Sequence, residues 1–136
     1  MQQNKNGFTL VEMMIVVVIL GILATIAVPN YINATERSKV SQAISDLKNL
    51  RTAQITWFHE NAAYSTDIIN ELAPLLGTVA LNPGTSVNWN YVANADGSVQ
   101  ADRIPPAPFT GTLVLNIDET WGGTYTGIGT TTPSYI

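Results

Sequence analysis

The longest pattern in the chain is an apolar run near its start. The run extends from Phe8 to Val28, and no side chain from Met13 to Pro29 is ionisable. A helix of that length would be about 31 Å long, close to the hydrocarbon thickness of a bilayer. The pattern therefore predicts a transmembrane helix.

A helical period resumes after Pro29. Apolar residues then recur on one stripe: Val40, Ile44, Leu47, Leu50, Trp57 and Phe58, with Ala43 and Ala53 beside it. Most charged residues of this stretch are expected off the stripe: Glu36, Lys39, Asp46, Lys48 and Arg51. An amphipathic helix needs a partner that covers its apolar face. We expect one long helix from Phe8 to about Asn61, whose second half backs a small domain.

The remaining chain alternates between strand and turn signals. A short helix is predicted from Thr66 to Leu76, with Ser65 or Thr66 as its cap and Gly77 at its end. The predicted strands and turns are the alternating "SVNWNYVA", the turn "NADG", Ser98 to Arg103, Gly111 to Asp118, the turn at Gly122–Gly123, and an edge strand from Thr124 to Ile128. "IPPAPF" is expected to break the sheet. The economical fold is α+β, with three or four antiparallel strands laid on the helix stripe.

Composition narrows the function classes. Charged residues make up 12% of the chain, against about 25% in a typical soluble domain. The net charge of -4 and the lack of a basic cluster argue against a nucleic-acid binder. The sequence has no cysteine and no nucleotide-binding motif, and its only histidine, His59, is expected to pack between helix and sheet. Nothing in the sequence supports an enzyme.

Glu12 is the anomaly, because it places a charge inside the apolar run. Such a charge costs about 2.5–3.5 kcal/mol on insertion scales, so it is a functional candidate. A cleaved secretory signal is a poor explanation, since the run is long and its small-residue cleavage pattern is weak. Glu12 could pair with another buried charge, or lie at the headgroup level where the helix dipole favours a carboxylate. The residues alone leave both readings open.

The short polar leader "MQQNKNG" runs directly into "FTLVE" and the apolar run. This arrangement resembles the type IV pilin family and its relatives, the pseudopilins of type II secretion. The resemblance rests on Gly7 before Phe8, Glu12 as the fifth residue of the mature chain, and Gly21 and Pro29 further along. It is strong over residues 5–31, looser through the following helix and weak beyond it.

The resemblance implies a processing and assembly pathway. A prepilin peptidase would cut between Gly7 and Phe8, and the new amine of Phe8 would be methylated. Glu12 would pair with the Phe8 amine of a neighbouring subunit and fix the register of a homo-oligomeric helical filament. The stretch from Gly21 to Pro29 would be the part of the helix that loses order in the filament.

The resemblance also divides the chain and places it in the cell. It implies a leader over residues 1–7, a transmembrane and polymerisation helix over 8–29, and a globular head over 30–136. The precursor would sit in the cytoplasmic (inner) membrane with its amino end inside, and then enter an extracellular filament through an assembly platform and a separate ATPase. The implied function is a structural subunit of a type IV pilus, or fimbrium, that serves adhesion or motility. The alternatives are a pseudopilin of type II secretion and a membrane-anchored binding module that never polymerises.

The chain departs from this pattern near its carboxyl end. Many type IV pilins close this region with a disulfide, which a chain without cysteine cannot form. We expect packing to hold the sheet instead, through Trp89, Tyr91, Trp121 and Tyr125. The major pseudopilin often binds calcium here, but Asp118 and Glu119 are only weak candidates because calcium needs six to eight oxygen ligands. No cofactor is expected.

Overall fold

The computed structural model describes residues 7–77, 88–104 and 109–126. The chain divides into two compact units, Met1–Glu36 and Arg37–Ile136.

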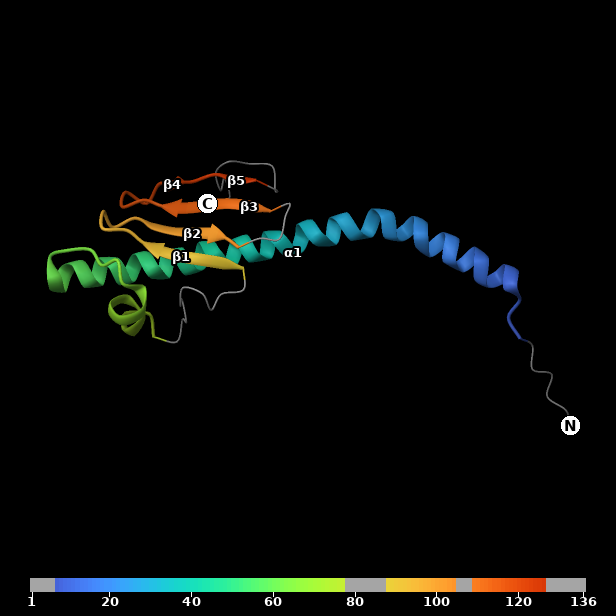
Figure 1. The fold of residues 1–136 in the computed structure, drawn as a ribbon, viewed down its shortest axis with the longest axis horizontal. Helices are drawn as coiled ribbons and strands as arrows, with labels where there is room; N and C mark the ends of the chain where they lie inside the picture. The colour runs from blue at the N-terminus through green and yellow to red at the C-terminus, as the bar shows by residue number, and fades with distance from the viewer. Residues whose placement is uncertain (1–6, 78–87, 105–108, 127–136) are drawn as a thin grey trace, which may run out of the picture. The chain divides into compact units, whose positions relative to one another are not determined.

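Helix α1 spans Leu10–Asn61 and contributes to both units (Figure 1). It begins two residues later than the predicted start at Phe8 and ends where the sequence predicted. The helix is continuous through Gly21 and Pro29, because the residues on both sides keep helical hydrogen bonding. In the first unit, each large apolar side chain from Phe8 to Ile32 exposes at least 42% of its surface.

The second unit builds its core between α1 and a β-sheet (Figure 1). From α1, Leu47 and Leu50 are fully buried, and Val40, Ala43 and Ala53 lie beside them. The sheet contributes Trp89, Tyr91, Ala93, Val99, Ala101, Leu113, Leu115 and Tyr125 to the same core. The predicted α+β fold, a long helix packed on a small antiparallel sheet, is confirmed.

The sheet is antiparallel throughout. Its strands are β1 (Trp89–Ala93), β2 (Val99–Arg103), β3 (Thr110–Leu115) and β4 (Trp121–Gly122), paired in that order. Strand β5 (Tyr125–Thr126) pairs with the other end of β3, where Gly111 faces Tyr125. The hairpin between β1 and β2 follows the predicted "NADG" turn, in which Gly97 has a φ of 84°. Trp89, Tyr91 and Tyr125 are buried and Trp121 packs against the core, as predicted.

Two strand predictions were wrong in detail. Strand β3 ends at Leu115 instead of Asp118, because Asn116 to Thr120 form a tight turn closed by the Asn116 N–H donating to the Thr120 carbonyl at 2.9 Å. That turn also creates β4, which the sequence did not predict. The expected edge strand from Thr124 to Ile128 begins one residue later, at Tyr125, and includes Thr126, while residues 127 and 128 lie outside the described residues.

Several helix predictions also need correction. Phe58 is 39% exposed and stacks on Tyr64, with ring centroids 4.6 Å apart, instead of joining the core. His59 is exposed, so it does not pack between helix and sheet. In contrast, Glu36 and Arg51, which were expected off the apolar stripe, are buried. The helical period predicts on which side of α1 each side chain lies. It does not predict which polar side chains are buried, because that depends on the loops that pack over the helix.

The region after α1 folds differently from the single short helix predicted. It forms a π-helical turn, Ile68–Leu72, followed by a 3-10 turn, Ala73–Leu76. The cap is Asp67 and not Ser65 or Thr66, because the Asp67 carboxylate accepts the N–H groups of Ile69 at 3.0 Å and Asn70 at 2.9 Å. The Ser65 hydroxyl instead accepts the N–H of Asp67 at 2.9 Å, and the backbone of Ser65 is bonded to Gln54.

Candidate functional site

Glu12 lies in the first turn of α1 and forms a reciprocal hydrogen-bond pair with Thr9. Its Oε2 accepts the backbone N–H of Thr9 at 2.8 Å and the Thr9 hydroxyl at 2.9 Å, while the N–H of Glu12 donates to Thr9 Oγ1 at 3.3 Å. This is a capping box, in which the side chains three residues apart satisfy each other's free N–H groups. The box fixes the start of α1 at Leu10.

The predicted cleavage site lies just outside the helix. Gly7, Phe8 and Thr9 precede α1 and have no regular secondary structure, and the side chain of Phe8 is 80% exposed. Only one oxygen of the Glu12 carboxylate is used by the capping box. Within the described part of the chain, Oε1 accepts no hydrogen bond, so it can receive a further donor.

The stretch from Gly21 to Pro29 is helical in the structure, but it contains a local weakness. Proline has no N–H, so the carbonyl of Thr25 lacks its usual donor four residues on. The Thr25 hydroxyl donates to the Ile22 carbonyl at 2.7 Å and does not replace that missing bond. A Cβ at Gly21 would meet nothing within 4 Å, so no packing inside this chain explains the glycine.

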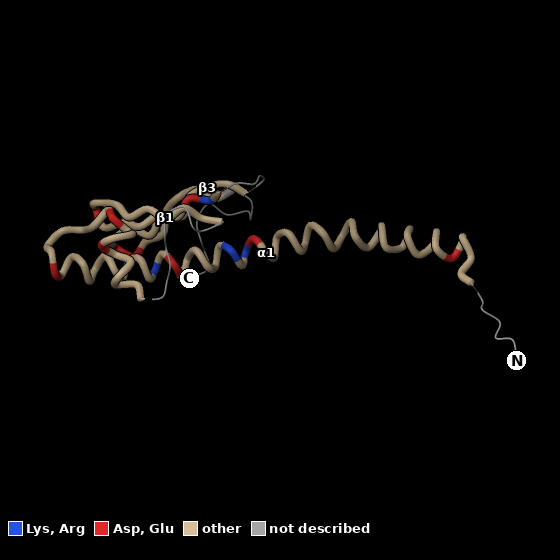
Figure 2. Tube along the Cα trace, turned by 60° about the horizontal axis from the view of Figure 1, so that its bottom comes forward, with Lys and Arg blue, Asp and Glu red and all other residues tan. Residues whose placement is uncertain are grey.

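The first part of α1, residues 10–35, presents a largely apolar surface with one acidic position, Glu12. Figure 2 shows a single acidic band near the start of α1, and the next charged residues are Glu36 and Arg37. By length and composition α1 can cross a membrane: its most apolar window has a mean hydropathy of 2.7 and is 0% buried within the chain. Glu12 is therefore the only charged side chain on the uncovered apolar segment of α1 from residue 10 to residue 29.

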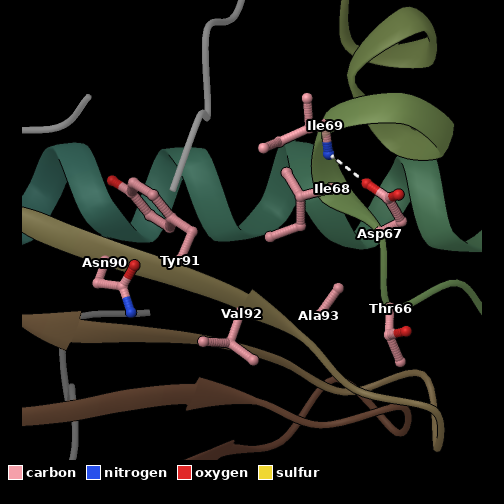
Figure 3. Close-up of a pocket in the computed structure, with 8 residues that line it drawn as sticks. All are labelled: Thr66, Asp67, Ile68, Ile69, Asn90, Tyr91, Val92 and Ala93. Carbon is pink, nitrogen blue, oxygen red and sulfur yellow. Dashed lines mark hydrogen bonds between the residues drawn. The ribbon is translucent and has the colours of Figure 1, made fainter. Parts of the chain in front are cut away.

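The head contains a hollow of about 460 Å³ between β1 and the turn that follows α1 (Figure 3). Asp67 lines it, but its carboxylate faces the N–H of Ile69 as a helix cap, and hydrogen bonds from Asn70 hold the pKa of Asp67 below its usual value. Tyr91 also lines it, and its hydroxyl donates to Asp46 Oδ2 at 2.6 Å. The Asp67 carboxylate and the Tyr91 hydroxyl are both hydrogen-bonded within the fold. They therefore give no indication that this hollow binds a ligand or catalyses a reaction.

The weak calcium candidates lie in the turn between β3 and β4. Oδ1 of Asp118 accepts the N–H of Thr120 at 3.0 Å and its hydroxyl at 2.5 Å. The hydroxyl bond is the main cause that holds the pKa of Asp118 below its usual value. Within the described ranges no group of three His, Cys, Asp or Glu residues is placed to hold a metal. Asp118 thus has a turn-forming role that accounts for its position.

Sequence reasoning missed three polar features. Thr9 was overlooked, although "TLVE" carries the Thr-x-x-Glu spacing of a capping box. Gln54 is fully buried: its Nε2 donates to the Ser65 carbonyl at 2.6 Å, and its Oε1 accepts the Ser65 N–H at 3.0 Å. Arg51 is buried against the β3–β4 turn and donates from Nη2 to the Ile117 carbonyl at 3.0 Å. The sequence around Gln54 or Arg51 gives no local sign of these contacts, because the partner of each lies in another segment of the chain.

Comparison with known proteins adds independent findings. Residues 2–28 match the prokaryotic N-terminal methylation motif. The chain is 40% identical to the type IV major pilin protein PilA of Myxococcus xanthus over 131 residues, which cover 96% of this chain and 57% of PilA. It is 53% identical over 53 residues to the type IV major fimbrial protein FimA of Dichelobacter nodosus, covering 39% of this chain and 34% of FimA. It is also 37% identical over 89 residues to the type II secretion system core protein G of Pseudomonas aeruginosa, covering 65% of this chain and 61% of that protein.

The methylation motif covers the part of the chain that carries the capping box and most of the apolar helix segment. The chain spans little more than half the length of PilA and about a third of FimA. The methylation motif, the fold and the similarity to two kinds of pilin-like relative nevertheless agree with one another. The chain thus carries the N-terminal methylation motif and is similar to type IV major pilins and to a type II secretion system core protein G.

Proposed function

We propose that this chain is a structural subunit that polymerises into a type IV pilus-like filament. One observation carries the proposal: the first part of α1 is apolar on every side, leaves its large side chains uncovered, and holds one carboxylate near its start. A helix that is apolar all round is stable only when it is buried in lipid or protein. A lipid bilayer before assembly and neighbouring copies after it would supply both environments.

Processing would supply the missing counter-charge. Hydrolysis of the Gly7–Phe8 peptide bond by a prepilin peptidase leaves an amine on Phe8, one helical turn from Glu12. Methylation of that amine retains its positive charge. A buried charge is tolerated when it is paired, whereas an unpaired one is strongly destabilising.

The capping box suggests how Glu12 could serve two partners. Oε2 remains bonded to Thr9 and keeps the carboxylate oriented, while Oε1 accepts the Phe8 amine of a neighbouring subunit. Only one axial offset between subunits would bring amine and carboxylate together, so the pair would set the register of the filament. Gly21 and Pro29 would let the helix lose order between them when the subunits pack, because the Thr25 carbonyl already lacks a helical donor.

The proposal implies a path through the cell. The precursor would sit in the cytoplasmic membrane with residues 1–7 inside and residues 30–136 outside. An assembly platform would extract it, driven by a separate ATPase, and the head would then face outward on the extracellular filament. The head would determine whether the fibre serves adhesion or motility.

A pseudopilin of type II secretion remains the second candidate. The similarity to a core protein G, which extends over 65% of this chain, favours it. The lack of cysteine weakens the case for a major pilin, whereas the lack of a strong acidic cluster near the carboxyl end weakens the case for a major pseudopilin. Detection of the chain in surface fibres, rather than only in the cell envelope, would separate the two functions.

The deciding experiment replaces Glu12 in the full-length chain. We expect Glu12→Ala to abolish incorporation into filaments, because the Phe8 amine would be buried without a counter-charge. Glu60→Ala is the matched control, since Glu60 is an exposed acid on the same helix. Sheared fibres are purified and their subunits sequenced from the amino end, where Phe8 is expected as the first residue. Normal incorporation of the Glu12→Ala chain would contradict the pairing, and fibres that retain residues 1–7 would contradict the processing step.

A further inference from the structure

A second hollow in the head lies between α1 and the end of the sheet that carries the β3–β4 turn. Its volume is about 290 Å³. It is lined by Lys48, Arg51, Thr52 and Ile55 from α1, and by Leu115, Glu119 and Trp121 from the sheet and turn. The hollow thus combines two cationic side chains and one carboxylate, that of Glu119, with an apolar wall.

Arg51 is the unusual member of this lining. Its side chain is more than nine-tenths buried, and Nε and Nη1 are buried without any hydrogen-bond partner. Only Nη2 is used, donating to the Ile117 carbonyl at 3.0 Å, while the guanidinium lies 5.9 Å from the centre of the Tyr64 ring. Buried donors are almost always satisfied, so two free N–H groups on one guanidinium need a physical explanation.

The geometry of a guanidinium limits which ligand would satisfy it. Its N–H groups form a planar fork that matches a carboxylate with two parallel hydrogen bonds. Lys48 adds a second positive charge, and Ile55, Leu115 and Trp121 offer an apolar surface for the remainder of a ligand. Pockets of this kind, apolar with a few placed polar groups, are typical of small-molecule sites.

We propose that this hollow is a binding site for a small organic carboxylate with an apolar body. The carboxylate is held by the free N–H groups of Arg51 and attracted by Lys48, and the apolar body contacts Ile55, Leu115 and Trp121. Because Nε and Nη1 are buried, the ligand enters when the turn from Asn116 to Thr120 moves and the Arg51–Ile117 bond is released. The site is formed by residues of one head and does not depend on polymerisation.

The test uses benzoate as the probe, added to the isotope-labelled full chain in detergent micelles. We expect a saturable shift of the Arg51 side-chain Nε–H resonance, together with shifts of the amides from Asn116 to Thr120. Benzamide has the same ring without the charge, so it controls for partition into micelles. Equal shifts with benzamide, or no saturable shift of the Nε–H with benzoate, would overturn the proposal.

Variants separate binding from folding. Arg51→Gln is expected to weaken benzoate binding by roughly tenfold or more, because it removes a charge-assisted pair. If Arg51→Gln does not fold, Lys48→Gln provides the test, since Lys48 is exposed and its loss should weaken binding without unfolding the head. Arg37→Gln removes an equal charge from an exposed position of α1 outside the hollow, so it should leave binding unchanged. Glu119→Gln is expected to strengthen binding, because it removes a like charge from the lining.

The outcome of the benzoate experiment can be interpreted separately from filament assembly. A chain that forms filaments normally but binds no benzoate would refute the carboxylate site and leave the proposed function intact. If the Arg51 Nε–H shifts only when the chain polymerises, its partner is a carboxylate of a neighbouring subunit, and the small-ligand proposal is wrong.

Discussion

At the residue scale, the observed capping role of Glu12 and its proposed assembly role do not exclude each other. The structure gives it a capping role through Thr9, which is the helix-start reading of this carboxylate. The proposed pairing with a neighbouring Phe8 amine uses the oxygen that the cap leaves free. Removal of Glu12 would therefore disturb both helix start and assembly, whereas Thr9→Ser would preserve the cap because serine offers the same hydroxyl.

Gln54 is the clearest residue-level determinant of head stability. It is fully buried and satisfies both backbone groups of Ser65. We expect Gln54→Leu to lower the free energy of unfolding by about 1–3 kcal/mol, because the Ser65 N–H and carbonyl would remain buried without partners. Urea unfolding measures the change. Thr56→Ala is the control, since the exposed Thr56 hydroxyl bonds only to the Thr52 carbonyl of its own helix, and an equal loss in both variants would contradict the role of Gln54.

Because of Tyr91, we expect the free energy of unfolding of the head to depend on pH in the alkaline range. Burial is the main cause that raises the pKa of Tyr91 above its ordinary value near 10, and the bond to Asp46 adds to it. Above pH 10 the unfolded chain can release this proton but the folded chain cannot, so the unfolded state binds fewer protons and stability falls as pH rises. The contribution of Tyr91 to folding stability is thus fully present below about pH 10 and decreases progressively as the pH rises above that value.

The pH prediction is checked by unfolding the wild-type chain and Tyr91→Phe between pH 8 and pH 11, values chosen to bracket the ordinary tyrosine pKa of about 10. We expect the wild type to lose more stability over this range than the variant, because the other tyrosines and lysines titrate in both. Parallel pH profiles would show that Tyr91 does not hold its proton more tightly in the folded state.

At the scale of elements, the join between β3 and β5 depends on glycine. Gly123 has a φ of 97°, and a Cβ there would lie 2.2 Å from the Thr112 carbonyl oxygen. The same holds for Gly111, because a Cβ added there would lie 2.0 Å from the Thr124 carbonyl oxygen. The bond from the Thr112 N–H to the Thr124 carbonyl, 2.7 Å long, can form only at this close backbone approach.

This geometry separates two adjacent glycines. We expect Gly123→Ala to destabilise the head by more than about 1 kcal/mol, because alanine is strained at positive φ and the added atom would collide with backbone. Gly122→Ala is the control, since its Cβ would meet nothing closer than 3.6 Å. Thermal unfolding of both variants measures the difference, and similar melting temperatures would contradict the close approach of β3 and β5.

At the scale of the whole molecule, the two units have different requirements. Among the residues that the structure describes, the buried apolar residues of the core lie between Val40 and Tyr125, whereas the large apolar side chains before residue 33 are exposed. We therefore expect a fragment that begins at Tyr31, and so retains the buried Glu36, to fold without detergent, while the full chain needs membrane or detergent. Circular dichroism and membrane flotation measure both properties. An unfolded fragment, or a full chain that stays soluble without detergent, would contradict this division.

The fold could be predicted from the sequence where local patterns carry the information. The period of apolar residues predicted α1 almost to the residue, and the alternation in "WNYVA" predicted β1 with the correct buried face. Three predictions were wrong: the cap is Asp67, β4 was not predicted, and Phe58 lies outside the core. In each case the outcome depends on hydrogen-bond partners or on loop packing that the apolar pattern does not specify. Within the candidate site, the position of the charge in the apolar run indicated Glu12, and the Thr-x-x-Glu spacing of "TLVE" is the local signal for Thr9.

The sequence by itself determined the apolar helix, its single early charge and the α+β class, because each depends on composition and spacing along one segment. Only the tertiary structure decided which polar side chains are buried and what they contact. Gln54 meets Ser65, and Arg51 meets Ile117 across 66 positions of the chain. Such pairs depend on how the loops close over α1, and a helical period cannot specify the path of a loop.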